Sequence, residues 1–363
     1  MPRTPDQNVG LRSLLLLACL VIIIAGLREA GAVLVPILTA FFIGVICIPP
    51  VNWLQRHGVR MGLAIVLVFI CVLAGFLVLS YFVSASISSF QENLPKYEAT
   101  LDQPLASFTN WLDSQGIEIS LSRLREQLDA GTVTGVLSSG LSALAGLLSD
   151  TLLIMLTVIF VLCEAAILPK KVRAMIGDDS SDLSEYQRAL TNLRTYLAVK
   201  TQLSLVTGVL AGLATWIIGV DYPVLWALLA FLLNYIPTLG SIIAAIPPVL
   251  LALVQFGWGW ALVVAGCYIA INISIGNLVE PRLMGRRLGL STLVVFLSMV
   301  FWGWVWGPIG MILSVPLTML LKILLLHSDD LRWVGLLLGS GSDDDLQAGR
   351  IELGPAGKQR SSS

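Results

Sequence analysis

Residues 234–248 read NYIPTLGSIIAAIPP and interrupt a very apolar part of the chain with an Asn, three prolines and a glycine. The surrounding residues 222–279 contain no Asp, Glu, Lys or Arg. Proline removes a backbone donor and frees the carbonyl one turn earlier, and glycine permits a tight turn. Asn234 supplies a side-chain donor and acceptor at the same place. Asn234, Pro237 and Gly240 therefore predict a broken helix with polar groups at the break.

A second interruption lies in the apolar run 288–321, where WGPIG contains Pro308 and Gly310. As one helix this run would be about 51 Å long, against a bilayer core of about 30 Å. PTLG is followed by SIIAAIP and PIG by MILSVP, so the two breaks resemble each other. If one hairpin enters from each side, they form inverted repeats, whose substrate sites lie at broken helices near the membrane midplane. The alternative is two ordinary loops, with prolines marking the helix ends.

Charged and amide side chains follow the first break. Glu280, in NLVEPRL, has the chemistry to bind a coupling proton or cation, and the alternative is an interfacial ion pair with Arg282. At about 100° per residue, Asn277 and Glu280 share one helix face, and Asn272 lies about 140° from Asn277. These Asn side chains would line a polar path or form interhelical hydrogen bonds. The candidate transport path is Asn234, Pro237, Gly240, Asn272, Asn277, Pro308 and Gly310, with Glu280 and Arg282 in coupling or gating.

Other polar and aromatic residues near the apolar runs have simpler interpretations. Lys200 is interpreted as a cytoplasmic anchor, following the positive-inside rule. Glu164 is interpreted as interfacial, with a proton relay as the alternative. Gln202 and Thr207 are candidates for a pathway. The cluster FWGWVWG, residues 301–307, would stack on a ring or form an ordinary aromatic belt.

The composition is typical of a helical membrane protein. The 363 residues are 56% hydrophobic and 12% charged, whereas soluble proteins carry about 25% charged residues. The net charge of −1 favours no nucleic-acid partner. The five Cys are dispersed without CxxC, and the sequence shows no nucleotide-binding glycine loop and no nucleophile with a paired base. We expect no enzyme activity, cofactor or metal, and we expect membrane lipids and a small molecule or ion as partners.

The predicted fold is all-α and polytopic, with about six full spans and two broken or re-entrant helical hairpins, because a crossing takes about 20 apolar residues. The spans are 13–27, 31–55, 61–91, 144–168, 201–220 and 258–280, and the hairpins are 222–256 and 288–321. Lys and Arg near the span ends place both termini in the cytoplasm. The predicted regions are transmembrane helices 1–3 in 1–91, an extracytoplasmic helical region in 92–140, a fourth span and a cytoplasmic amphipathic helix in 141–200, a transport core in 201–326 and a disordered tail in 327–363.

Two polar segments carry weaker helical patterns. Residues 121–131 predict a short amphipathic helix. A stripe of Leu and Tyr at 183–197 predicts a helix on the membrane surface that leads into the next span, with a partner-binding heptad as the alternative. The N-terminal apolar run also resembles a signal peptide, but the many spans that follow favour an uncleaved first helix.

Two long segments carry a family resemblance: NYIPTLGSIIAAIPPVLLAL and NLVEPRLMGRRLGLSTLVVFLSMVFWGWVWGPIGMILSVPLTMLLK. They resemble the signature segments of the autoinducer-2 exporter (AI-2E) family of bacterial membrane proteins, and the resemblance extends from the first spans to about Lys322. It implies a polytopic transporter of the inner membrane. Members have been assigned export of the quorum-sensing signal autoinducer-2, a small furanone-type diol, or exchange of sodium or lithium for protons. The resemblance also implies a homo-oligomer, such as a pentamer.

Three functions are open on the sequence. The first is a proton-coupled secondary transporter that exports a small polar organic molecule. The second is a sodium or lithium/proton antiporter, against which stands the scarcity of acidic residues within the spans. The third is a passive channel or a membrane scaffold.

Overall fold

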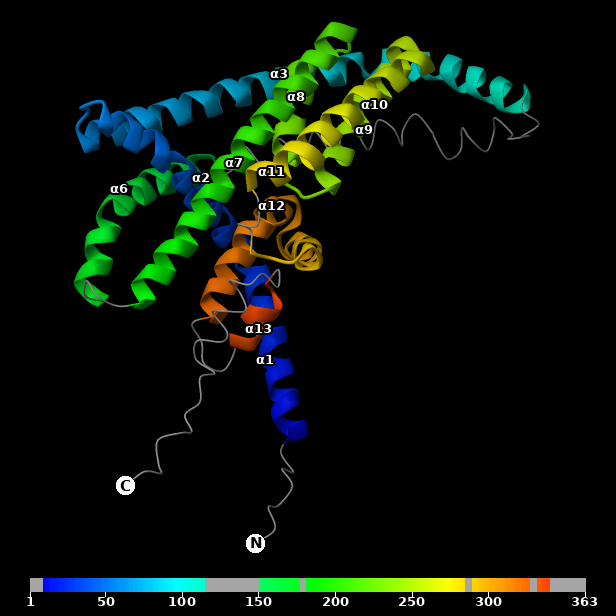
Figure 1. The fold of residues 1–363 in the computed structure, drawn as a ribbon. Coiled ribbons are helices and arrows are strands. Elements are labelled where there is room, and N and C mark those ends of the chain that lie inside the picture. Colours follow the sequence, from blue (N-terminus) through cyan, green and yellow to red (C-terminus); the bar gives the residue numbers. More distant parts are fainter. Residues whose placement is uncertain (1–8, 115–150, 177–180, 285–288, 327–331, 340–363) are drawn as a thin grey trace, which may run out of the picture.

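The computed structural model of the protein (Figure 1) describes residues 9–114, 151–176, 181–284, 289–326 and 332–339. Regular structure in these ranges is helical and contains no strand, which confirms the predicted all-α class. The helices are α1 (Val9–Glu29), α2 (Gly31–Arg56), α3 (Met61–Ser114), α6 (Thr151–Ile176), α7 (Ser181–Ile218), α8 (Pro223–Leu233), α9 (Leu239–Phe256), α10 (Trp258–Asn272), the π-helix η1 (Ile273–Val279), α11 (Glu280–Met284), α12 (Thr292–Leu326) and α13 (Arg332–Leu337).

Six helices in the described ranges are long and apolar enough to cross a membrane, so the protein is a multi-pass membrane protein, as predicted. Four of them coincide with predicted spans. The other two are α9, predicted as one limb of the first hairpin, and α12, predicted as the whole second hairpin. The six segments are Gly31–Arg56, Met61–Asn93, Thr191–Ile218, Leu239–Phe256, Trp258–Leu283 and Thr292–Leu326.

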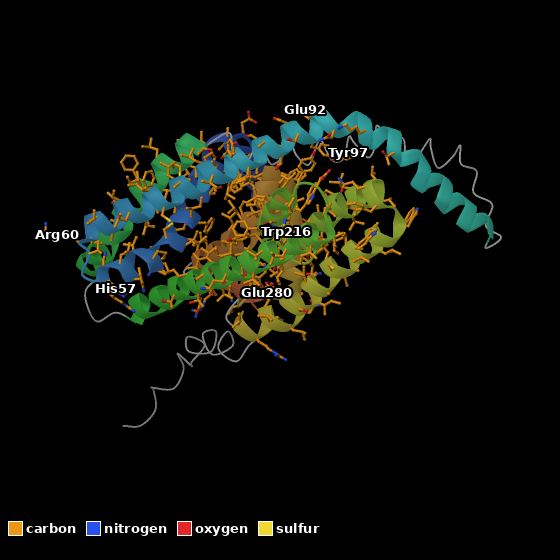
Figure 2. All side chains as sticks on the ribbon, turned by 90° about the horizontal axis from the view of Figure 1, so that it is seen from above. His57, Arg60, Glu92, Tyr97, Trp216 and Glu280 are labelled. Atoms are coloured by element: carbon orange, nitrogen blue, oxygen red, sulfur yellow. The ribbon has the colours of Figure 1, made fainter. Side chains whose placement is uncertain are left out.

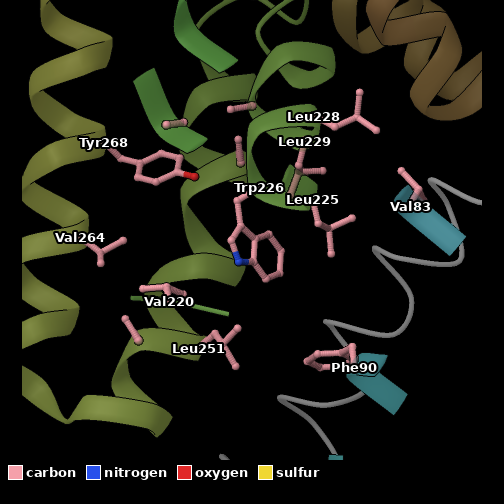
Figure 3. Packing of buried hydrophobic residues seen from close by; sticks show 14 residues of the cluster. Val83, Phe90, Val220, Leu225, Trp226, Leu228, Leu229, Leu251, Val264 and Tyr268 are labelled. Carbon is pink, nitrogen blue, oxygen red and sulfur yellow. The ribbon is translucent and has the colours of Figure 1, made fainter. Parts of the chain in front are cut away.

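Three apolar clusters hold the helices together. One joins α2, α3 and α6 around the fully buried Ala64 and Val158. A second joins α2, α7 and α12, and includes Trp302. The third joins α3, α7, α8, α9 and α10 around Trp226, which is 1% exposed (Figure 3). Because α7 contributes to the second and third clusters, it packs against both segments that were predicted to be broken.

Helix α7 is longer than the sequence predicted. It runs without interruption from Ser181 to Ile218, and no proline occurs within it. Leu193 and Leu197, at the end of the apolar stripe, are buried in the cluster with α12. The predicted helix at 183–197 is therefore present and leads directly into the span, with Leu193 and Leu197 packed on protein, and its position at the membrane surface stays a prediction. Helix α3 likewise continues beyond its span to Ser114. The predicted helix at 121–131 lies outside the described residues, as does most of the tail predicted at 327–363. Within that tail Arg332–Leu337 form α13, with Gly335 buried, so this part is ordered and the prediction of disorder is wrong for it.

Both predicted breaks are present, and each separates a short limb from a longer one. Helix α8 has 11 residues and is about 16 Å long, too short to cross a core of about 30 Å. Helix α9 has 18 residues, or about 27 Å. Trp306 and Gly307 have non-helical backbone angles and kink α12 into limbs of about 21 Å and about 28 Å. The short first limb favours a re-entrant hairpin over an ordinary loop.

Candidate transport site

A partly buried ion pair joins α7 to the segment after α10, where Glu280 lies beside α7 (Figure 2). Lys200 Nζ lies 2.7 Å from Glu280 Oε1, and the two side chains are 4% and 24% exposed. Removing either charge from water is costly, and the cost is offset only when the two charges neutralise each other at close range. The interpretation of Lys200 as a surface anchor is therefore wrong. Glu280 pairs with Lys200, whereas Arg282 is exposed.

The same face of α7 holds the first break. Ser204, one turn after Lys200, accepts a hydrogen bond from Asn234 Nδ2 at 3.0 Å, and both side chains are buried. Thr201 Oγ1 accepts a hydrogen bond from the Tyr235 hydroxyl at 2.7 Å. Asn234 and Tyr235 of the break are thus held by Ser204 and Thr201, which follow Lys200 within about one turn of α7.

The other side of the break contacts α10. Ser241 Oγ lies 2.8 Å from Asn272 Oδ1, to which it donates a hydrogen bond. Asn272 ends α10, and the π-helix η1 begins at the next residue. The Glu280 N–H donates to the carbonyl oxygen of Ile275, five residues earlier, as a π-helix requires. Short π-helical segments frequently occur at functional sites. The break therefore lies between α7 and α10, and η1 carries the chain from Asn272 to the ion pair.

Because the π-helix η1 follows Asn272 and contains Asn277, the angle of about 140° expected between these two side chains does not apply. The expected 100° per residue applies to an α-helix, and the wider π turn brings residues five apart closer to one side. Asn272 is half-buried and bonded to Ser241, whereas Asn277 is exposed. The structure thus bonds Asn234 and Glu280 to neighbouring turns of α7 and Asn272 to α9, and it leaves Asn277 and Arg282 exposed.

Two buried hydroxyls beside these contacts have no hydrogen-bond partner within the part of the chain that the structure describes. Thr207, 5% exposed, follows Ser204 by one turn of α7. Tyr268, 6% exposed, precedes Asn272 by one turn of α10 and projects into the cluster around Trp226 (Figure 3). A buried hydroxyl without a partner costs about 1–3 kcal/mol. Each of these hydroxyls therefore keeps an unused hydrogen-bond donor and acceptor among the described residues.

Only glycine fits at both breaks, because a backbone carbonyl oxygen occupies the place where a Cβ atom would lie. A Cβ atom on Gly240 would lie 1.8 Å from the carbonyl oxygen of Leu233, and one on Gly310 would lie 2.0 Å from that of Trp302. Both distances are far below any van der Waals contact. The two breaks therefore use the same device, in which a glycine at the start of the second limb packs on the last turn of the first. This agreement extends the similarity between the two segments from sequence to geometry.

The second break lies in different surroundings from the first. Trp306 Nε1 donates a hydrogen bond to the carbonyl oxygen of Leu27 at 2.9 Å, and Arg28 lies over the ring of Trp304 at 5.4 Å. Trp306 belongs to the cluster of α2, α7 and α12, whereas the first break borders the cluster around Trp226. The second break therefore meets the end of α1 through Trp306, in a different cluster from the Asn234 contacts, and the described contacts do not join Pro308 or Gly310 to Asn234.

Sequence reasoning missed five residues of this site and misinterpreted Lys200. The five are Thr201, Ser204, Tyr235, Ser241 and Tyr268. Lys200 and Ser204 had a usable signal, because together with Thr207 they recur at helical spacing on one face of an otherwise apolar helix. Tyr235 and Ser241 are adjacent to residues of the predicted break, and their partners depend on tertiary packing that the sequence does not encode locally.

The fold and site define a class: a polytopic helical membrane protein whose broken helices surround buried polar groups and an ion pair, as in membrane transporters. The chain belongs to the AI-2E family, since the model of the AI-2E family transporters matches residues 17–329. It is 42% identical over 317 residues to the AI-2 transport protein TqsA of Escherichia coli strain K12, covering 87% of this chain and 92% of TqsA. It is 37% identical over 337 residues to the E. coli K12 protein named "Putative transport protein YhhT", covering 93% and 96% of the two chains. A "Putative transport protein" of Haemophilus influenzae strain Rd is 39% identical over 345 residues, with 93% and 99% covered.

Proposed function

We propose that this protein is a secondary transporter of the bacterial inner membrane that exports a small polar organic molecule resembling autoinducer-2, coupled to protons. The single observation that carries the proposal is the buried Lys200–Glu280 pair, which adjoins a broken helix. Ionisable side chains within membrane segments usually mark substrate or proton pathways. The name of TqsA, an AI-2 transport protein, supports the solute class.

The geometry suggests how a proton couples to movement. A proton on Glu280 removes the negative charge that compensates Lys200. Lys200, almost fully buried, then carries an unpaired charge, which favours a rearrangement that exposes it to water or to another partner. Since Thr201 and Ser204 hold Tyr235 and Asn234, displacement of this part of α7 also displaces the first break.

The solute-facing groups in this proposal are hydroxyls and amides. Thr207 and Tyr268 offer unpaired hydroxyls, and Asn234 and Asn272 offer amides on either side of the break. A small molecule that carries several hydroxyls would find both donors and acceptors there. Exchange of sodium for protons is less well supported, because the ammonium of Lys200 already occupies the carboxylate that a sodium ion would need.

The test is uptake of autoinducer-2 into inverted vesicles with a proton gradient imposed or collapsed. We expect accumulation by the wild type that depends on the gradient, and loss of that dependence in Glu280→Gln. Glu92→Gln is the matched control, because Glu92 is exposed on α3. Accumulation that ignores the gradient, or normal coupled transport by Glu280→Gln, would contradict the proposal. A pH-sensitive dye with added sodium or lithium measures the antiport alternative in the same vesicles.

A further inference from the structure

A second polar cluster lies at the end of the hairpin away from the break, where α8 begins and α9 ends. The Tyr97 hydroxyl on α3 donates a hydrogen bond to the Asp221 carboxylate at 2.7 Å. Gln255, at the end of α9, donates its amide to the same carboxylate and accepts from the Asp221 N–H at 3.3 Å. Asp221 thus joins three segments that are far apart in the sequence, and it closes the open end of the hairpin.

Tyr222 adds a second connection between the same segments. Its hydroxyl accepts a hydrogen bond from Asn93 Nδ2 at 3.1 Å, and it adopts a left-handed backbone with φ of 62°. Such a backbone is uncommon for a bulky residue and persists only when its surroundings enforce it. Trp226, 1% exposed, supplies part of that enforcement by donating to the carbonyl oxygen of Asp221 at 2.7 Å. The turn before α8 is therefore fixed to the buried core on one side and to α3 on the other.

The α3 side of the cluster is also rigid. Phe90, 1% exposed, stacks on the Tyr97 ring with centroids 5.9 Å apart and meets the Tyr222 ring edge-on at 6.1 Å. Burial, with hydrogen bonds to Tyr222 and Asp221, raises the pKa of the Tyr97 hydroxyl well above its usual range. Tyr97 consequently stays a hydrogen-bond donor at any physiological pH. Tyr97 lies just beyond the span Met61–Asn93 and Asp221 just beyond Thr191–Ile218, so the cluster stands at one membrane surface.

We propose that Tyr97 and Asp221 form a latch that holds the open end of the α8–α9 hairpin against α3, so that this end separates from α3 only when their hydrogen bond breaks. The inference rests on the proposed function only in taking this separation as a step of transport. Helix α3 is continuous from its span through Tyr97 to Ser114, and its extramembrane part is therefore mechanically connected to the hairpin (Figure 1). Displacement of that part would act on the hairpin through the latch.

The test measures opening directly, in lipid nanodiscs, with no transported solute. Val220, 2% exposed and adjacent to Asp221, is replaced by Cys in a chain whose five native cysteines are removed. The rate of labelling by a polar maleimide then reports the opening of the cluster. We expect Tyr97→Phe to raise this rate roughly threefold to tenfold, since the lost hydrogen bond has a charged acceptor that is exposed.

Two comparisons separate a latch from general loosening. Tyr81→Phe is the matched control, because Tyr81 lies on the same helix and is 71% exposed, and it should leave the rate unchanged. Asp221→Ala should raise the rate at least as much as Tyr97→Phe, and Tyr97→Phe should add nothing in the Asp221→Ala background. Equal rates for Tyr97→Phe and Tyr81→Phe, or additive effects of Tyr97→Phe and Asp221→Ala, would overturn the latch.

Hydrogen exchange provides the same test without the introduced cysteine. The backbone N–H groups of Val220 and Trp226 donate to Thr215 and Tyr222 at 2.9 and 3.2 Å, and both should exchange faster in Tyr97→Phe. Unchanged exchange there would also count against the latch. If Glu280→Gln transports normally while Tyr97→Phe still speeds labelling, the proposed function fails and the latch stands.

Discussion

Replacing Glu280 by Gln tests the ion pair through stability as well as transport. Removal of one partner from a buried pair typically costs about 3–5 kcal/mol, because the other charge is left uncompensated. Here the Gln amide oxygen still accepts one hydrogen bond from Lys200, and the Glu280 side chain is 24% exposed. We therefore expect Glu280→Gln to lower the free energy of unfolding by about 2–3 kcal/mol, below the typical range.

Replacing the other partner, Lys200, should lower the free energy of unfolding less than Glu280→Gln does. Lys200→Met leaves the carboxylate of Glu280, which water already reaches, so we expect a loss of about 1–2 kcal/mol. The double variant buries no unpaired charge and should lose much less than the sum of the two single variants. Denaturant titration of the purified protein in detergent, followed by tryptophan fluorescence, measures all four forms. A Glu280→Gln variant as stable as the wild type, or strictly additive losses, would refute the reasoning.

Two further changes test the second break and the unpaired hydroxyl. Gly310→Ala should prevent folding or cost at least about 3 kcal/mol, because its Cβ would overlap the carbonyl oxygen of Trp302, whereas Gly266→Ala, with nothing within 4 Å, should be neutral or stabilising in the same unfolding assay. Thr207→Val should leave the free energy of unfolding unchanged or raise it by up to about 1–3 kcal/mol, since it removes a buried hydroxyl that has no partner, while reducing uptake of autoinducer-2; Thr201→Val, which removes the acceptor of Tyr235, should cost about 1 kcal/mol in the same measurement. A stability loss for Thr207→Val equal to that of Thr201→Val would show that the hydroxyl is bonded within the protein.

The sequence was sufficient to predict what depends on local chemistry. Proline, glycine and Asn within apolar runs predicted both helix breaks, and the structure has them at residues 234–238 and at Trp306 and Gly307. The sequence also singled out Gly240 and Gly310, whose contacts with carbonyl oxygens leave no room for another residue. Intrinsic backbone preference acts over a few residues, and for that reason it can be read without the tertiary structure.

The sequence could not predict the contacts made between helices. Lys200 and Glu280 are 80 residues apart in the sequence, and the positive-inside rule already accounted for a lysine at the start of a span. The angle between Asn272 and Asn277 was calculated for an α-helix, and no residue between them predicts the π-helix that the structure has there. The continuation of α7 through residue 200 was hidden because a change from polar to apolar composition resembles a boundary between elements.

The π-helix η1 has a mechanical consequence for the carboxylate that follows it. Its turns are wider than those of an α-helix, so a change to α-helical winding would rotate Glu280 about the helix axis and lengthen the segment. Once a proton removes the attraction of Lys200, nothing in the pair opposes this rewinding. Protonation of Glu280 would then rotate α11 about its own axis and move it along that axis.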